Sequence, residues 1–103
     1  MGLDIGLKVV TEVVVDMNIT HNLGKMWQAA GIYEALYLSE GKTAKEILPT
    51  LKEGLAKMIA NPEKYHALSA GNGWGTYRQA VPWLIELIEQ FELYPDGKVW
   101  VCR

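Results

Sequence analysis

The segment "KVVTEVVVDMNITHNLGKMW", from Lys8 to Trp27, changes character halfway along, and this change sets the expected fold. Its first half is dense in valine and has one apolar face and one mixed face, with Glu12 and Asp16 on the mixed face. Such alternation predicts a strand over residues 8–17. The polar second half then leads into a helix, so the segment predicts a strand followed directly by a helix.

The first helix is expected to begin at Thr20 or Asn22, because both residue types cap helices and the helical apolar spacing starts immediately after them. The same pattern places Gly24 and Gly31 inside this helix, where glycine costs roughly 1 kcal/mol relative to alanine. Close packing of another backbone, or close approach of a ligand, would explain them. Gly41 is the expected C-terminal cap.

Two further long helices and one short helix follow from the same kind of evidence. Capping boxes predict the two long helix starts, and a proline in the first turn predicts the short helix. A proline inside each long helix predicts a kink or a restart. These markers are Thr43 with Glu46, Thr76 with Gln79, Pro62 for the short helix, and the internal Pro49 and Pro82.

A final strand is expected over residues 99–102 after the turn "YPDGK". We expect it to pair with the valine-rich strand, which gives an α+β fold with three longer helices and a short one on a small sheet. Two strands alone make a poor sheet, so strands from a second copy of the chain would extend it. The sequence therefore predicts one domain, residues 1–103, and a homo-oligomer.

The composition excludes several classes of protein. With 103 residues, 50% of them hydrophobic, the chain can bury a core, and its net charge of -2 with no basic cluster argues against nucleic-acid binding. The single cysteine, Cys102, rules out an intrachain disulfide and fits a cytoplasmic protein. No apolar segment is long enough to cross a bilayer, so no membrane partner is expected.

Two polar clusters, "NITHN" (residues 18–22) and "NGWGT" (residues 72–76), each precede an expected helix start. Unpaired backbone N–H groups at a helix start favour anions. Trp74 and Tyr77 could stack on a flat ring, and asparagine side chains could bind the polar edges of a base or sugar. Capping and turn formation alone would also account for the Asn, Thr and Gly residues.

His21 is the side chain in these clusters that titrates near neutral pH. It could anchor the loop, donate to an anionic ligand, or act as a general base with Asp16 or Glu12. No serine or cysteine beside it in sequence completes a nucleophilic set, and no Cys/His spacing indicates a metal. The sequence predicts neither a cofactor nor a metal site.

"NITHNLGKMWQAAGIYEALY" and "NGWGTY" resemble a family of small, largely uncharacterised proteins of bacteriophages and bacteria. The similarity covers nearly the whole length, including the C-terminal "VWVCR". It implies an origin and the location of a site, and a phage protein of this kind would counter host defence by sequestering a nucleotide-derived signal. The implied site residues are Asn18, Thr20, His21, Asn22, Asn72, Gly73, Trp74, Gly75, Thr76 and Tyr77.

The leading hypothesis is a polar pocket between two helix N-termini that binds an anionic, nucleotide-like small molecule without transforming it. Arg103 and backbone N–H groups would face the negative charge, while Trp74 or Tyr77 would stack on the ring. One alternative is a hydrolase or lyase that uses His21 with Asp16. Another is a protein–protein interaction module in which both motifs are only structural.

Overall fold

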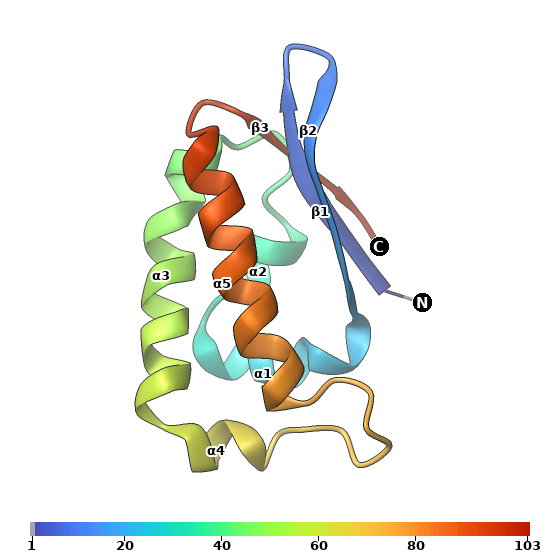
Figure 1. Cartoon of the computed structure of the whole chain (residues 1–103), viewed down its shortest axis with the longest axis vertical. Coiled ribbons are helices and arrows are strands. Elements are labelled where there is room, and N and C mark those ends of the chain that lie inside the picture. The colour runs from blue at the N-terminus through green and yellow to red at the C-terminus, as the bar shows by residue number, and fades with distance from the viewer. Residues whose placement is uncertain (1) are drawn as a thin grey trace.

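Strand β1 (Gly2–Val9) lies at the centre of the sheet in the computed structural model, which describes residues 2–103 (Figure 1). Leu3, Ile5 and Leu7 alternate along it and are fully buried. This period-two pattern is what a strand with one face on the core requires. The expected single strand over residues 8–17 is therefore wrong, because an N-terminal strand precedes it.

The valine-rich run forms the turn and second strand of a hairpin. β2 (Glu12–Thr20) pairs antiparallel with β1, and Val9 lies opposite Glu12 across a turn made by Val10 and Thr11. Val10 adopts a positive φ of 59° and is 93% exposed. Valine is among the residues least suited to this conformation, so the run gives no turn signal and reads as an unbroken strand.

The sheet has three antiparallel strands in the order β2-β1-β3, and helices cover one of its faces (Figure 1). β3 (Lys98–Cys102) pairs with β1 and not with β2, as the register of Leu7 with Val99 shows. The α+β class and a small sheet built from N- and C-terminal strands are thus confirmed. The partner of the last strand was predicted wrongly because the hairpin was missed.

The expected first helix is divided in two. α1 (Gly24–Ala30) ends at Gly31, whose φ of 78° is the left-handed conformation that stops a helix, and α2 (Tyr33–Tyr37) follows. Gly31 is therefore a C-cap and not a packing residue within a helix. Gly41 lies beyond α2 and is not its C-cap. Its N–H donates to the carbonyl of Val99, so it bonds to the outer edge of β3.

The two long helices begin where their capping boxes predict. α3 (Ala44–Ala60) follows Thr43, and α5 (Tyr77–Leu93) follows Thr76. Each runs unbroken through its internal proline, since one lost N–H bond does not end a helix whose apolar face is packed. The short α4 (Pro62–His66) lies between them, with its proline at the first turn as expected.

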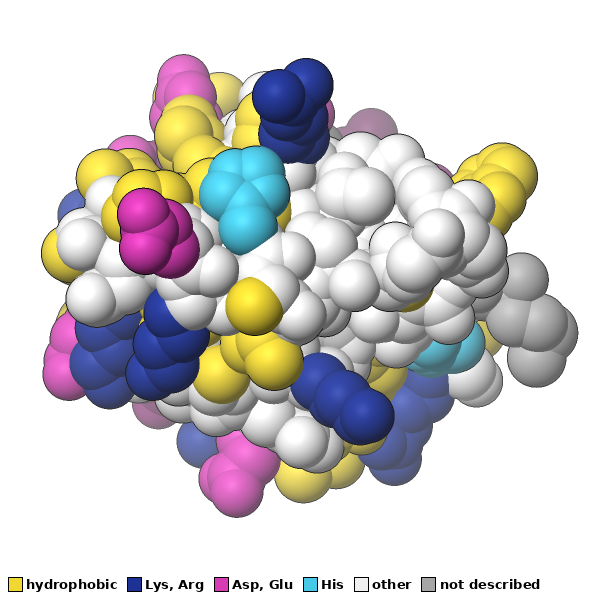
Figure 2. All heavy atoms as spheres, turned by 90° about the horizontal axis from the view of Figure 1, so that it is seen from below, with side chains coloured by type: hydrophobic (Ala, Val, Ile, Leu, Met, Phe, Trp, Pro, Cys, Tyr) yellow, Lys and Arg dark blue, Asp and Glu magenta, His cyan; other side chains and the backbone are white. Residues whose placement is uncertain are grey.

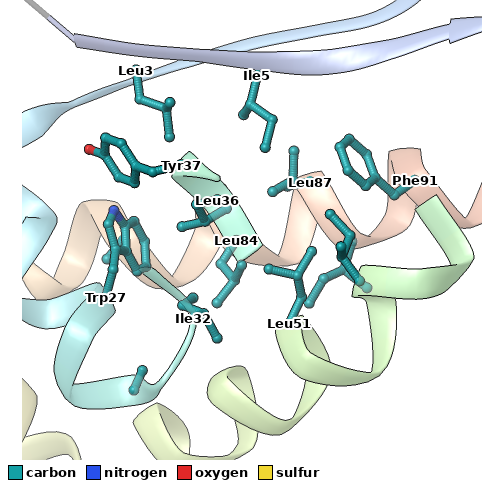
Figure 3. Packing of buried hydrophobic residues seen from close by; sticks show 14 of the residues in the cluster. Leu3, Ile5, Trp27, Ile32, Leu36, Tyr37, Leu51, Leu84, Leu87 and Phe91 are labelled. Carbon is teal, nitrogen blue, oxygen red and sulfur yellow. The ribbon is translucent and has the colours of Figure 1, made fainter. Parts of the chain in front are cut away.

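One continuous core fills the space between the sheet and the helices. α3 and α5 lie side by side (Figure 1), and both contribute buried apolar side chains to the same core as β1. In Figure 3, Leu3 and Ile5 project from the strand toward Leu36, Leu87 and Phe91 of the helices. Over residues 2–103, none of these helices is both long enough and apolar enough to cross a membrane.

Candidate functional site

The two polar motifs, about fifty residues apart in the chain, meet at one corner of the molecule. Thr20 caps a short 3-10 helix, η1 (His21–Leu23), at the end of β2, with its hydroxyl accepting a bond from the N–H of Asn22 (3.3 Å). The side-chain amide of Asn22 donates to the carbonyl of Trp74 (3.2 Å). A Cβ added to Gly75 would lie 2.8 Å from that of Asn22, so only glycine fits against it.

The loop before α5 presents Trp74 to solvent. Gly73 and Gly75 on either side of it have φ angles of 83° and 91°, which glycine adopts without strain. The N–H of Trp74 donates to the side chain of Asn72 (3.0 Å). These contacts fix the loop while leaving the indole 68% exposed.

Side chains of α5 and of the loop before it bond to the backbone N–H groups at the start of α5. The side-chain oxygen of Gln79, Oε1, accepts from the N–H groups of Gly75 (2.8 Å) and Thr76 (3.0 Å). Ser69 Oγ accepts from the N–H of Tyr77 (2.9 Å). Thr76 Oγ1 in turn accepts from the N–H of Gln79 (3.3 Å). The N–H groups of Gly75, Thr76, Tyr77 and Gln79, which were expected to face an anion here, therefore already have partners.

Tyr77 belongs to the packing of the helices. Its hydroxyl donates to the carbonyl of Met58 in α3 (2.8 Å), and its ring lies 4.4 Å from that of His66. It lines neither of the clefts described below. Trp74 is thus the aromatic residue of this motif that is available for stacking.

His21 has a tyrosine as its partner. Its Nδ1 lies 3.0 Å from the hydroxyl of Tyr37, and Tyr37 stacks on Tyr33 with ring centroids 4.3 Å apart. Burial raises the pKa of the Tyr37 hydroxyl, and the neighbouring Tyr33 raises it further, so Tyr37 stays protonated near neutral pH. A protonated Tyr37 hydroxyl can donate to Nδ1, and a neutral His21 then carries its proton on Nε2; in the other tautomer the hydroxyl accepts from Nδ1.

Asp16 is not part of this arrangement. It is exposed on β2, opposite Gly6 of β1, and lines neither cleft. Among the interactions of residues 2–103, no hydrogen bond or ion pair joins it to His21. The expected acid–base pair would need a rearrangement of β2 or of the segment that follows it.

A cleft of about 1130 Å³, which we call the basic cleft, opens between η1, α1, α2 and the loop after α4. Lys25 from α1 and Arg103 from the C-terminus line it, together with His21, Tyr33 and Tyr37. No aspartate or glutamate belongs to the lining in the part of the chain that the structure describes. Its neutral polar side chains are Asn22, Gln28, Ser69 and Asn72.

A second cleft of about 840 Å³, which we call the amide cleft, lies on the other side of Asn22. His21 and Asn22 line both clefts, which adjoin at these two residues. The other polar side chains of the amide cleft are Asn18, Thr20 and Gln79, and Trp74 lies at its border. Figure 2 views this end of the molecule, where uncharged side chains and backbone form a broad area with basic side chains along its margin.

The clefts contain part of the predicted site and several residues that the sequence reading missed. Asn18, Thr20, His21, Asn22, Asn72, Trp74 and Arg103 line one cleft or both, whereas Gly73, Gly75, Thr76 and Tyr77 shape the loop and helix start. Lys25, Gln28, Tyr33, Tyr37 and Gln79 were missed as lining residues. Lys25 and Gln28 are exposed and one turn apart beside the motif, a spacing that could have marked them.

Neither a cluster of metal-binding side chains nor a comparison with known proteins assigns a ligand to the clefts. Within residues 2–103, no three His, Cys, Asp or Glu side chains gather to hold an ion. No protein-family model, curated protein or solved structure matches the chain.

Proposed function

We propose that the protein binds an anionic small molecule in the basic cleft and holds it without transforming it. The observation that carries this proposal is that Lys25 and Arg103 both line the cleft while no aspartate or glutamate of the described residues does. A cleft lined by one sign of charge concentrates ligands of the opposite sign. This local excess of positive charge stands out on a chain whose net charge is -2.

Lys25 and Arg103 do not belong to the ion pairs found within the described residues. In residues 2–103, the ion pairs join Lys45 with Asp96, Lys52 with Glu92 and Lys57 with Glu53. Neither cation of the basic cleft takes part in one. The fork of N–H donors on Arg103 matches a phosphate or a carboxylate, and Lys25 adds a compact charge.

The remaining lining suits binding better than catalysis. Ser69, the serine of the basic cleft, already accepts a bond from the backbone of Tyr77, and the described lining has no aspartate or glutamate side chain to serve as a general base. His21 would donate from Nε2 to the ligand, and the stacked Tyr33 and Tyr37 offer a wall for its less polar part. Sequestration of this kind is also what the resemblance to phage proteins implies.

Thermal unfolding and calorimetric titration with phosphate- and carboxylate-bearing metabolites would test the proposal. We expect stabilisation that weakens as salt is raised, and at least about a five-fold loss of affinity in Lys25→Ala and in Arg103→Ala. Lys8→Ala, an exposed lysine of β1, is the matched control and should bind normally. Equal binding by all four proteins would contradict the proposal, and chemical conversion of the ligand would replace it with an enzymatic function.

A further inference from the structure

The amide cleft differs in chemistry from the basic cleft beside it. Its lining carries no Lys, Arg, Asp or Glu within residues 2–103, and its polar groups are the side chains of Asn18, Asn22 and Gln79 with Thr20 and His21. Trp74 borders it with an indole that is 68% exposed. Amide groups beside an accessible aromatic face are suited to a neutral, flat and polar group.

The bonds already made by these amides decide which of their atoms remain for a ligand. Asn18 Nδ2 donates to Asp4 (2.8 Å), and Asn22 Nδ2 donates to the carbonyl of Trp74 (3.2 Å), so each keeps a carbonyl oxygen as an acceptor. Gln79 uses its oxygen for two backbone N–H groups and keeps its Nε2 as a donor. The cleft therefore offers acceptors to an amino group and a donor to a ring nitrogen.

We infer that the amide cleft binds a nucleobase of the adenine or cytosine type, so that the ligand of this protein is a nucleotide whose base lies against Trp74 and whose phosphate lies in the basic cleft. This inference rests on the proposed anion binding. Adenine and cytosine each present an amino group next to an acceptor nitrogen, which is the pattern that the free amide atoms complement. Because His21 and Asn22 line both clefts, the two clefts adjoin, and a molecule that extends past these residues would reach both.

Three ligands separate the contributions of base and phosphate in a calorimetric titration: AMP, IMP and ribose 5-phosphate. AMP should bind most tightly. IMP, which has an oxo group in place of the amino group, should bind roughly 3- to 10-fold more weakly. Ribose 5-phosphate, which has no base, should lose on the order of ten-fold or more, because stacking on an aromatic side chain is also lost.

Variants then assign the effect to the amide cleft. Trp74→Ala should weaken AMP by about ten-fold while leaving ribose 5-phosphate unchanged, and Trp74→Phe should recover part of the loss. Gln79→Glu keeps an oxygen for the N–H groups of Gly75 and Thr76 but removes the donor, so it should weaken AMP without lowering the melting temperature. Ile59→Ala, an exposed apolar residue of α3 outside both clefts, is the control.

The outcomes distinguish this inference from the proposal beneath it. Equal binding of AMP and ribose 5-phosphate, unaffected by Trp74→Ala, would overturn the base-binding role and leave anion binding in place. Equal binding of AMP and IMP would overturn the choice of an amino-bearing base. Absence of binding by both AMP and ribose 5-phosphate at millimolar concentration would overturn the nucleotide ligand, and absence of binding by the carboxylate-bearing metabolites as well would overturn anion binding.

Discussion

The hydroxyl of Tyr37 lies between the core and the basic cleft, and its ionisation should report on the site. Burial raises its pKa above the ordinary value of 10.0, and Tyr33 adds to the shift. Above that value the unfolded chain loses this proton while the folded chain retains it, so the stability that Tyr37 confers is complete at lower pH and is lost as the pH rises through the folded pKa. Urea unfolding across this alkaline range should show the loss.

Tyr37→Phe tests this assignment, because the variant has no proton to lose at this position. At neutral pH we expect it to cost about 0.5–1.5 kcal/mol of unfolding free energy through the lost bond to His21. Its stability should then fall less steeply than that of the wild type above the ordinary tyrosine pKa. Parallel pH profiles for the two proteins would show that another group is responsible.

Val10 at the hairpin turn is a second residue whose replacement gives a clear expectation. Its positive φ of 59° is unfavourable for a valine, and its side chain is 93% exposed and makes little compensating contact. Val10→Gly should therefore raise the unfolding free energy by about 0.5–1 kcal/mol, as measured by urea denaturation. Val9→Gly, on the adjacent strand position, should lower it, and stabilisation by both would attribute the effect to something other than the turn.

At the scale of elements, Gly54 controls how closely α3 approaches the connection between α1 and α2. A Cβ at this position would lie 2.2 Å from Cγ2 of Ile32. Gly54→Ala should lower the unfolding free energy by about 1–3 kcal/mol, although alanine is normally the better helix residue. Gly71→Ala, whose added Cβ meets nothing within 4 Å, should be close to neutral in the same denaturation experiment.

The elements that the sequence predicted well are those with local signals. Capping boxes located the starts of α3 and α5, and a proline located α4. The hairpin and the break at Gly31 were missed because the deciding information is not local: a valine occupies the turn, and the glycine reads equally well as packing or as a cap. Leu3, Ile5 and Leu7 alternate with other residues, which is a local signal of the strand β1.

The candidate site was predictable to a similar extent. The two motifs supplied His21, Asn22 and Trp74, because polar residues beside a helix start can be recognised from the sequence alone. Tyr33 and Tyr37 read as part of an apolar helical stripe, and only the fold turns them toward the cleft. The pairing of Lys25 with Arg103 joins the first helix to the last residue of the chain, which only a three-dimensional arrangement can show.

At the scale of the whole molecule, one edge of the sheet is covered by another part of the chain and the other edge is open. The segment before α3 covers the outer edge of β3, where Gly41 donates to the carbonyl of Val99 (2.9 Å) and Val99 donates to that of Lys42 (2.8 Å). β2 pairs only with β1 within the described residues and contains neither lysine nor proline. Its protection is limited to Glu12, Asp16 and a bulge at Val14, where the register with β1 shifts, so its open edge can still pair with another strand.

The expected homo-oligomer therefore remains a prediction with a definite location, in which a second copy adds its own β2 along this edge. Light scattering at micromolar concentration should give the mass of a dimer. Val13→Lys, at an exposed position of β2, should shift the equilibrium toward the monomer, whereas Val10→Lys in the turn should not. A monomeric wild-type protein would contradict this arrangement.

The position of Arg103 directly after β3 has a consequence for motion. β3 has five residues, and beyond Val99 its outer edge is bonded to the side chain of Glu40 and not to another strand, so its end is the kind of place where a chain opens without unfolding as a whole. A ligand anchored by Arg103 would have to be released before β3 could separate. Amide hydrogen exchange at Trp100, which pairs with Gly6 of β1, should therefore slow when the ligand is bound, while exchange at the tip of the β1–β2 hairpin should not change.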